Sequence, residues 1–154
     1  MGQVLFRPAR TGDGRAVFDV TWLSVKELAA SHYSADVIRN WMGERTPAYY
    51  EELILNGRMF VAEQDGVVVG FVDSEPGELT RLFILPSAVG QGLGKRLLAI
   101  GIEQARLAHQ SAIRVEATLN AVSFYEHHGF RMTGNGIASH SVGGPPIAVV
   151  YMEL

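Results

Sequence analysis

A run of alternating glycines most constrains what this chain can fold into and bind. Gly90, Gly92 and Gly94 separate an apolar, β-rich run that stops at Pro86 from the clearest amphipathic pattern of the chain. The first N–H groups of a helix lack intrahelical partners, and the helix dipole adds about half a positive charge there. Glycines let an anion approach such a helix start closely. The junction therefore predicts an anion-binding turn, with a plain glycine-rich connection as the alternative.

Two common nucleotide-binding motifs fail at this junction. A P-loop needs glycine where Val89 stands and a hydroxyl residue where Arg96 stands. The dinucleotide fingerprint needs glycine where Lys95 stands, although Glu116 lies roughly where its ribose-binding acid would. Fewer than about 60 residues follow the turn, too few for the further parallel units of a doubly wound fold. A nucleotide-binding redox enzyme is therefore disfavoured.

Hydrophobic periodicity and turn residues give the order of the elements. Expected helices cover about 13–30, 34–41, 48–55, 92–110 and 120–128, and expected strands cover 4–7, 59–63, 67–73, 79–85, 112–117, 130–132 and 147–152. Asp65-Gly66 predicts a tight hairpin. This order predicts one α+β (mixed α/β) domain over residues 1–154, with helices on both faces of one sheet and a parallel pairing only across the helix that begins near Gly92.

Composition excludes several classes of protein. A net charge of −3 gives no electrostatic reason to expect nucleic acid or a membrane as a partner. The absence of cysteine excludes disulfides, thiolate metal sites and a cysteine acyl-enzyme. The adjacent His127 and His128 would diverge on a helix, so we expect no metal. The polar start of the chain lacks the apolar stretch of a signal peptide, so we expect a cytoplasmic location.

Two segments together resemble the GCN5-related N-acetyltransferase superfamily. Residues 89–94 resemble its acetyl-CoA turn, written Arg/Gln-x-x-Gly-x-Gly/Ala, with Val89 in place of the customary Arg or Gln. Residues 118–130 resemble its second motif, a short helix that carries Phe124-Tyr125-Glu126 and ends at Gly129-Phe130. Val89 would remove one side-chain contact to the pyrophosphate but leave the backbone donors. His32-Tyr33-Ser34 followed by Trp41 looks like a YafP-like bacterial subgroup.

This resemblance implies a mainly antiparallel sheet that is splayed at the cofactor site, with acetyl-CoA as the acetyl donor. Tyr125 would protonate the CoA thiolate, and Glu78 is the candidate acceptor of the amine's proton, with Glu116 as a weaker alternative. The implied cofactor contacts lie before, in and after the glycine turn: Leu82, Phe83, Ile84, Val89, Gly90, Gln91, Gly92, Leu93, Gly94, Lys95, Thr118 and Asn120.

The implied acceptor contacts are His32, Tyr33 and Trp41. Each side chain also has a plainer reading. Tyr125, Tyr33 and Trp41 could be packing residues, His32 a surface cap, and Glu78 an exposed charge at a strand edge.

The implied function is acetyl-CoA-dependent transfer of an acetyl group to a primary amine of a small molecule or peptide. Because the chain has no cysteine nucleophile, direct attack in a ternary complex is the economical mechanism. A non-catalytic acyl-CoA-binding sensor or interaction module is the alternative, and Val89 mildly favours it. The apolar strand expected at 147–152 could serve as the edge of a homodimer.

Overall fold

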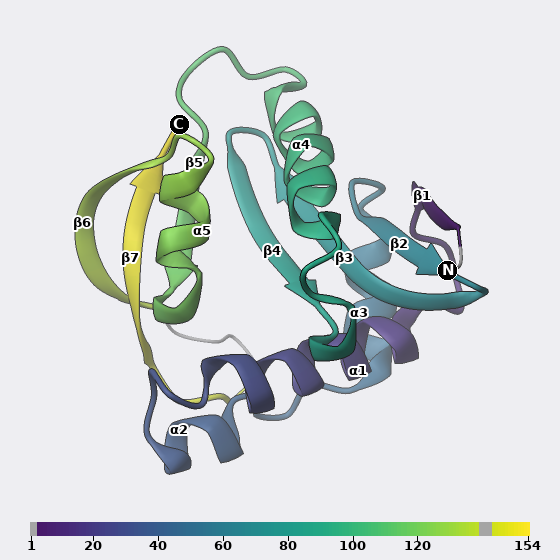
Figure 1. The fold of residues 1–154 in the computed structure, drawn as a ribbon, viewed down its shortest axis with the longest axis horizontal. Helices are drawn as coiled ribbons and strands as arrows, with labels where there is room; N and C mark the ends of the chain where they lie inside the picture. Colours follow the sequence, from purple (N-terminus) through teal and green to yellow (C-terminus); the bar gives the residue numbers. More distant parts are fainter. Residues whose placement is uncertain (1–2, 139–142) are drawn as a thin grey trace.

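A central sheet with the strand order β1-β2-β3-β4-β5-β7-β6 organises the computed structural model, which describes residues 3–138 and 143–154 (Figure 1). Its strands are β1 (Val4–Pro8), β2 (Phe60–Gln64), β3 (Val67–Glu75), β4 (Glu78–Ile84), β5 (Arg114–Thr118), β6 (Arg131–Ala138) and β7 (Ile147–Glu153). Neighbouring strands run antiparallel except for β4 and β5, which run parallel. The predicted mixed α/β class is confirmed.

The helices largely match the sequence patterns. They are α1 (Gly14–Ser24), the π-helical η1 (Val25–Ala29), α2 (Ala35–Asn40), α3 (Pro47–Ile54), the 3₁₀ turn η2 (Pro86–Ala88), α4 (Leu93–Arg106), the 3₁₀ turn η3 (Leu119–Ala121) and α5 (Val122–His127). The side chain of Thr46 accepts a hydrogen bond from the Tyr49 N–H, and Pro47 occupies the first helical position of α3. In the part of the chain that the structure describes, no helix is long and apolar enough to cross a bilayer.

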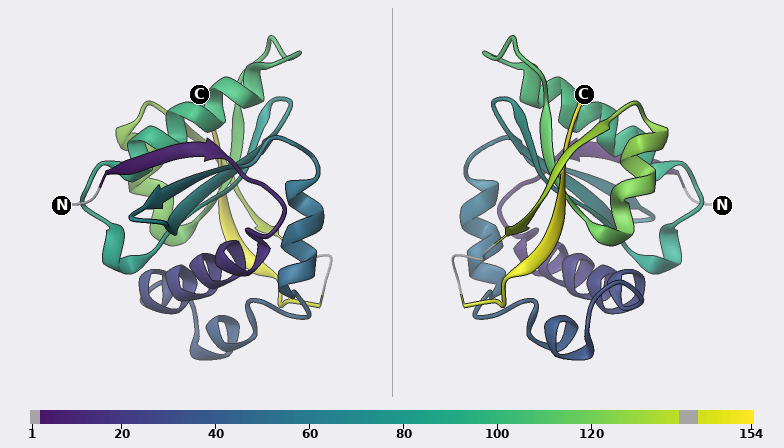
Figure 2. Two further views of the ribbon diagram at one scale, coloured as in Figure 1. Left: turned by 90° about the vertical axis from the view of Figure 1, so that its right-hand side faces the viewer. Right: turned by 90° about the vertical axis from the view of Figure 1, so that its left-hand side faces the viewer.

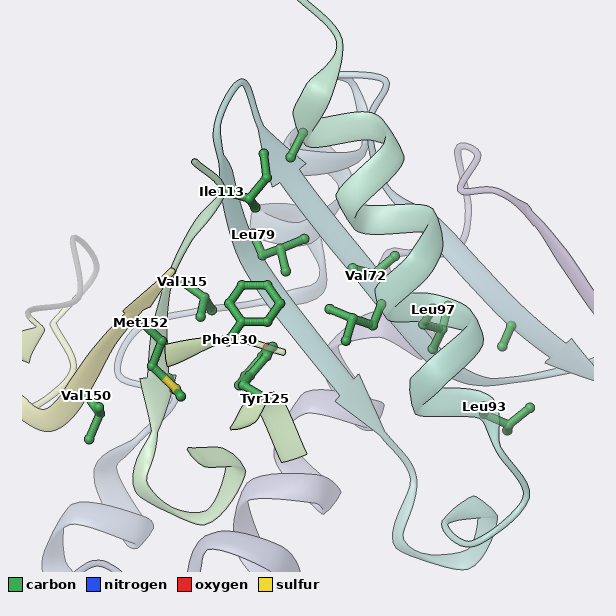
Figure 3. Packing of buried hydrophobic residues seen from close by; sticks show 14 of the residues in the cluster. Val72, Leu79, Leu93, Leu97, Ile113, Val115, Tyr125, Phe130, Val150 and Met152 are labelled. Carbon is green, nitrogen blue, oxygen red and sulfur yellow. The ribbon is translucent and has the colours of Figure 1, made fainter. Parts of the chain in front are cut away.

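The sheet carries helices on both faces (Figure 2). Side chains of β3 alternate between the faces, so Phe71 packs into a buried cluster with Val17 and Tyr50, whereas Val72 packs into a second cluster with Leu97. Figure 3 shows this second cluster, which places Tyr125 beside Phe130. The predicted cover of helices on both faces is confirmed.

β4 and β5 separate soon after they meet. They pair only at Glu78↔Arg114 and Leu79↔Val115, and the strands then diverge. On its other side, β4 pairs with β3 at Asp73↔Arg81 and Ser74↔Leu79, so Thr80 is an extra residue in a β-bulge. The bulge re-aims β4 at the point where the pairing with β5 stops. The predicted splay of the sheet is therefore confirmed.

Two expectations about the last strands are wrong. The strand expected at 130–132 extends to Ala138, because Gly134 and Gly136 interrupt the apolar alternation that would have revealed it. The strand expected at 147–152 is not a sheet edge, because β7 lies between β5 and β6. β6 occupies the edge instead, since its residues find hydrogen-bonding partners only on β7 among the described residues. The homodimer was predicted from an exposed edge at this strand, and β7 does not provide such an edge.

Candidate active site

The glycine turn joins the end of β4 to the start of α4. Gly90 has φ 84° and Gly92, the residue that caps α4, has φ 77°, values that favour glycine. The first turn of α4 contains no acidic residue, and the Arg96 N–H is the one that bonds back to the Gly92 carbonyl, at 3.3 Å. The preceding N–H groups therefore point out of the helix start, as an anion site requires.

Gly94 has a packing reason of its own. A Cβ at this position would lie 3.1 Å from Cε1 of Phe124 and 3.3 Å from Cδ1 of Ile84, whereas nothing lies within 4 Å of a Cβ built at Gly90 or Gly92. Gly94 thus lets α4 approach α5 closely. Val89 has an exposed fraction of 49%, so its side chain faces solvent beside the turn. Lys95 is exposed at the same helix start.

A narrow slot of about 70 Å³ lies where β4 and β5 diverge. Thr80, Leu82 and Phe83 line it from β4, Thr118 lines it from β5, and Tyr125 lines it from α5. Tyr125 is buried, and this burial raises the pKa of its phenol above the ordinary value. A phenol with a raised pKa stays protonated at neutral pH, so Tyr125 can act as a proton donor in the slot.

The slot adjoins a cavity of about 320 Å³. Thr80, Arg81, Phe83, Glu116 and Thr118 line both spaces. We call this space the cavity; its described walls also include Trp41, Arg45, Tyr49, Tyr50, Glu78, Leu79, Ala138, Ile147 and Val149. A group that enters the slot therefore meets a molecule that occupies the cavity.

Glu78 is half-buried on the wall of the cavity, at the start of β4. Burial raises the pKa of its carboxyl, and the negative charge of Glu116 raises it further, while Arg114 opposes both effects. The structure thus brings Glu78 and Glu116 to one cavity, next to the slot that Tyr125 lines. A carboxylate with a raised pKa is a better acceptor for the proton of an amine.

The three predicted acceptor contacts differ in whether they reach the cavity. Trp41 is buried and lines the cavity. The Tyr33 ring packs edge-on against Trp41 at 5.0 Å, and its hydroxyl donates to the Ala148 carbonyl at 2.6 Å and accepts from the Leu119 N–H at 3.0 Å. His32 is exposed and lies beside Ser31, with 3.0 Å between the ring Nδ1 and the hydroxyl oxygen. Only Trp41 of the three lies on the described walls of the cavity.

The two predicted polar contacts before α5 also differ. Thr118 lines both the slot and the cavity. Asn120 has a buried side-chain oxygen, Oδ1, for which the described residues provide no hydrogen-bond donor. Thr80 has a buried hydroxyl in the same situation. Both atoms are available to a bound molecule or to water.

Several residues of the site were not found from the sequence. Thr80 could not be recognised because a bulge is a property of the pairing with β3, not of the strand's own pattern. Arg45, Tyr49 and Arg81 reach the cavity from a loop, from α3 and from β4. No local motif marks these three residues, and only the packing of α3 against the sheet brings them together.

A family model described as an acetyltransferase (GNAT) domain matches residues 29–144. The mycothiol acetyltransferase of Streptomyces griseus is 31% identical over 123 residues, which are 73% of this chain and 39% of that protein. The Escherichia coli peptidyl-lysine N-acetyltransferase YiaC is 30% identical over 94 residues, 60% of this chain and 63% of that protein. The chain thus spans less than two thirds of the length of these two relatives.

The predicted likeness to YafP-like proteins is confirmed. The uncharacterized N-acetyltransferase YafP of Escherichia coli is 24% identical over 131 residues, 85% of this chain and 83% of that protein.

Solved structures share the fold. A GCN5-related N-acetyltransferase from Rhodopseudomonas palustris superposes with a TM-score of 0.88 at 22% identity, over 99% of this chain and 96% of that one. The PaiA N-acetyltransferase of Thermoplasma acidophilum, solved in complex with coenzyme A, has a TM-score of 0.78 at 20% identity, over 98% of each chain.

Proposed function

Since the chain belongs to the GCN5-related N-acetyltransferase family, whose model matches residues 29–144, we propose that it transfers an acetyl group from acetyl-CoA to a primary amine. The acceptor would be a small molecule or a peptide. One observation carries the proposal. The slot between the diverging β4 and β5 is lined by the buried phenol of Tyr125 and adjoins a cavity with the carboxylate of Glu78 on its wall. We also propose that residues 1–154 form one N-acetyltransferase domain.

The described residues fit acetyl-CoA in two places. The start of α4 offers backbone N–H groups and Lys95 to a pyrophosphate, with no carboxylate in the first helical turn. The edge of β4 at Leu82, Phe83 and Ile84 has no partner on β5 among the described residues, so its backbone groups can pair with the amides of an extended chain. When bound, acetyl-CoA supplies the thioester that donates the acetyl group.

Each remaining residue has a defined part in the proposed reaction. Glu78 accepts a proton from the ammonium group of the acceptor, and the neutral nitrogen then forms a bond to the acetyl carbon. Backbone N–H groups of β4 stabilise the negative charge on the carbonyl oxygen. Tyr125 donates its proton to the sulfur as the carbon–sulfur bond breaks, and the second proton that the nitrogen loses in forming the amide restores the phenol. Among the predicted acceptor contacts, Trp41 touches the cavity directly and Tyr33 positions Trp41.

The test combines binding and turnover. Acetyl-CoA and CoA should raise the melting temperature of the purified chain, whereas NAD and ATP should not, because only a ligand of the folded state stabilises it. Release of CoA in the presence of an amine panel then measures transfer. Replacing Tyr125 by Phe should lower kcat about 10²-fold and leave acetyl-CoA binding unchanged.

The exposed tyrosine Tyr151 provides the matched control, since Tyr151→Phe makes the same chemical change outside the slot. Equal loss of kcat in both variants would contradict the role of Tyr125. Binding of acetyl-CoA without transfer to any amine would instead favour the non-catalytic sensor. Stabilisation by NAD in place of acetyl-CoA would contradict the proposed acetyltransferase function.

A further inference from the structure

The walls of the cavity carry both signs of charge. Arg45 and Arg81 contribute two positive charges, and Glu78 and Glu116 contribute two negative charges. A site for a simple cationic amine needs a surplus of carboxylates, because each guanidinium repels the ammonium group. Among the described residues of the walls, the two positive and two negative charges balance instead. The chemistry of the walls therefore favours an acceptor that is itself doubly charged.

The two arginines meet at one aromatic ring. Arg81 donates to the Tyr49 hydroxyl at 3.4 Å, and the Arg45 guanidinium lies over the Tyr49 ring, 5.9 Å from its centre. Arg45 also donates to the Tyr50 hydroxyl at 3.2 Å. These contacts orient both guanidinium groups from the α3 side of the cavity. A planar guanidinium held in this way binds a carboxylate through paired hydrogen bonds.

Arg81 keeps donor capacity for a ligand although it has a protein partner. Its ion pair with the buried Asp73 is long, 3.4 Å between Nη1 and Oδ2, and 27% of the Arg81 side chain is exposed. A guanidinium has five N–H donors in a fixed fork. The contacts to Asp73 and Tyr49 thus hold the arginine in place without using all of its donors.

The two carboxylates lie on the strands that form the slot. Glu78 stands on β4 where the pairing with β5 begins. Glu116 stands on β5, two residues after Arg114, which is the residue that pairs with Glu78. Both side chains line the same cavity, and the negative charge of Glu116 contributes to the raised pKa of Glu78. An ammonium group between them would relieve the repulsion between the two carboxylates. It would also lie beside the slot, where the acetyl group has to arrive.

We propose that the acceptor is an amino acid or a similar small zwitterion, whose carboxylate binds Arg45 and Arg81 while its ammonium group faces Glu78 and Glu116. This inference rests on the proposed acetyltransferase function and names the class of its substrate. The volume of about 320 Å³ is at the small end of the range for small-molecule sites. Trp41, Phe83 and Val149 add apolar surface to the walls and favour an apolar side chain on the acceptor.

Matched acceptors test the proposal. The members of each set share one side chain and differ at the carboxyl group: phenylalanine is compared with phenylalaninamide and 2-phenylethylamine, and leucine with leucinamide. The wild-type chain, saturated with acetyl-CoA, should show kcat/KM at least about tenfold higher for the carboxylate member of each set. Equal or higher values for the amides and decarboxylated amines would overturn the proposal while leaving the acetyltransferase function intact.

Variants of the arginines separate recognition of the carboxylate from other effects. Arg45→Gln and Arg81→Gln should each raise KM for the amino acid about tenfold or more, with a smaller change in kcat and no change in KM for the amide. Arg106→Gln, at the end of α4 and away from the cavity, is the matched control. Arg81→Gln removes the ion pair to Asp73 and could therefore unfold the chain. Arg45→Gln keeps this ion pair and tests the proposal independently. A rise in melting temperature with acetyl-CoA shows that each variant is folded.

Calorimetric titration covers the case in which no amine is acetylated. The wild-type chain is saturated with CoA and titrated with phenylalanine and then with phenylalaninamide. Binding of phenylalanine but not of phenylalaninamide supports the zwitterion site, even if no amine is acetylated and the proposed catalytic function is therefore wrong. Equal binding of both compounds, or binding of neither, overturns the inference.

Discussion

Val89 is the residue at which the glycine turn departs from its family pattern. Its side chain is about half exposed and lies directly before Gly90, whose backbone has a positive φ. An arginine here would add a charged donor beside the N–H groups at the start of α4. Replacing Val89 by Arg should tighten acetyl-CoA binding by about 1 kcal/mol, roughly fivefold in Kd, measured by calorimetry at low salt.

The matched control for Val89→Arg is Leu107→Arg. Leu107 is also exposed but lies at the opposite end of α4 from the glycine turn. The same change of charge there should leave Kd unaltered. If both variants lower the Kd for acetyl-CoA equally, the gain comes from the change in net charge and not from the position of residue 89 beside the glycine turn. The gain at Val89 should also shrink as salt is added.

Glu116 sets part of the pKa of Glu78. Burial raises this pKa first, and the charge of Glu116 adds to the effect. Replacing Glu116 by Gln removes the repulsion, so the carboxylate of Glu78 should form at lower pH. The acid limb of the kcat/KM profile should therefore move to lower pH, whereas Glu78→Gln should abolish this limb. Glu103→Gln, on the exposed part of α4, should leave the profile in place.

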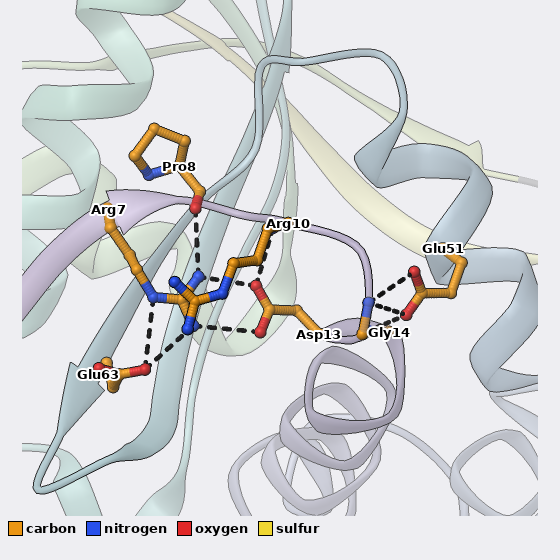
Figure 4. Close-up of polar contacts among 8 residues, drawn as sticks. Arg7, Pro8, Arg10, Asp13, Gly14, Glu51 and Glu63 are labelled. Atoms are coloured by element: carbon orange, nitrogen blue, oxygen red, sulfur yellow. Dashed lines mark hydrogen bonds and ion pairs between the residues drawn. The ribbon is translucent and has the colours of Figure 1, made fainter.

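At the scale of elements, a carboxylate from α3 caps the start of α1 (Figure 4). Glu51 accepts from the N–H of Gly12 at 3.1 Å and from the N–H of Gly14 at 2.6 Å, while Asp13, the residue that precedes α1, makes no side-chain cap. A Cβ on Gly14 would lie 2.6 Å from the Pro47 carbonyl oxygen, so glycine is needed for this close contact. The cap fixes α1 against α3, and α3 supplies Tyr49 to the cavity.

Removal of the cap should destabilise the fold. Replacing Glu51 by Ala should lower the free energy of unfolding by about 1–2 kcal/mol, because two N–H groups lose a charged acceptor. Urea denaturation measures the change. Glu52→Ala, next to it on the same helix but exposed, makes the same change in helix propensity without touching the cap. A similar loss in both variants would show that the cap contributes nothing.

At the scale of the whole molecule, one arginine joins three separate segments (Figure 4). Arg7 on β1 donates to Asp13 at 2.8 Å and 3.1 Å and to Glu63 on β2 at 3.0 Å. Burial alone would raise the pKa of Asp13, but the hydrogen bonds from Arg7 and from the Arg10 N–H outweigh it and lower the pKa. The negative form of Asp13 is thus favoured by folding.

Stability should consequently fall in acid. A carboxyl whose pKa is lower in the folded chain than in the unfolded chain stabilises the protein above its unfolded pKa, near 4, and loses this contribution as the pH falls through the folded value. Asp13→Asn should reduce stability by about 1–3 kcal/mol at pH 7 and flatten the decline below about pH 4, in urea titrations at several pH values. An unchanged decline would contradict the role of Asp13. Asp36→Asn, an exposed aspartate, provides the control.

Local patterns were enough to predict most elements and the family. The Thr46-Pro47 start of α3, the Asp65-Gly66 hairpin and the glycines before α4 are each determined by the conformations of a few neighbouring residues. The same is true of the short helix that ends at Gly129. Such signals do not depend on distant parts of the chain. They predicted the mixed class and the parallel pairing across α4, and they indicated Tyr125 as the candidate proton donor.

The tertiary structure alone decided the shape and charge of the site. The bulge at Thr80 depends on the register of β4 against β3, and the place of β7 inside the sheet depends on its pairing with both β5 and β6. Arg45 and Arg81 meet because Tyr49, on α3, contacts both. By itself the sequence determined the conformation of the glycine turn before α4, since a turn is a local conformation. Which charges line the cavity depends on long-range packing, which no local pattern contains.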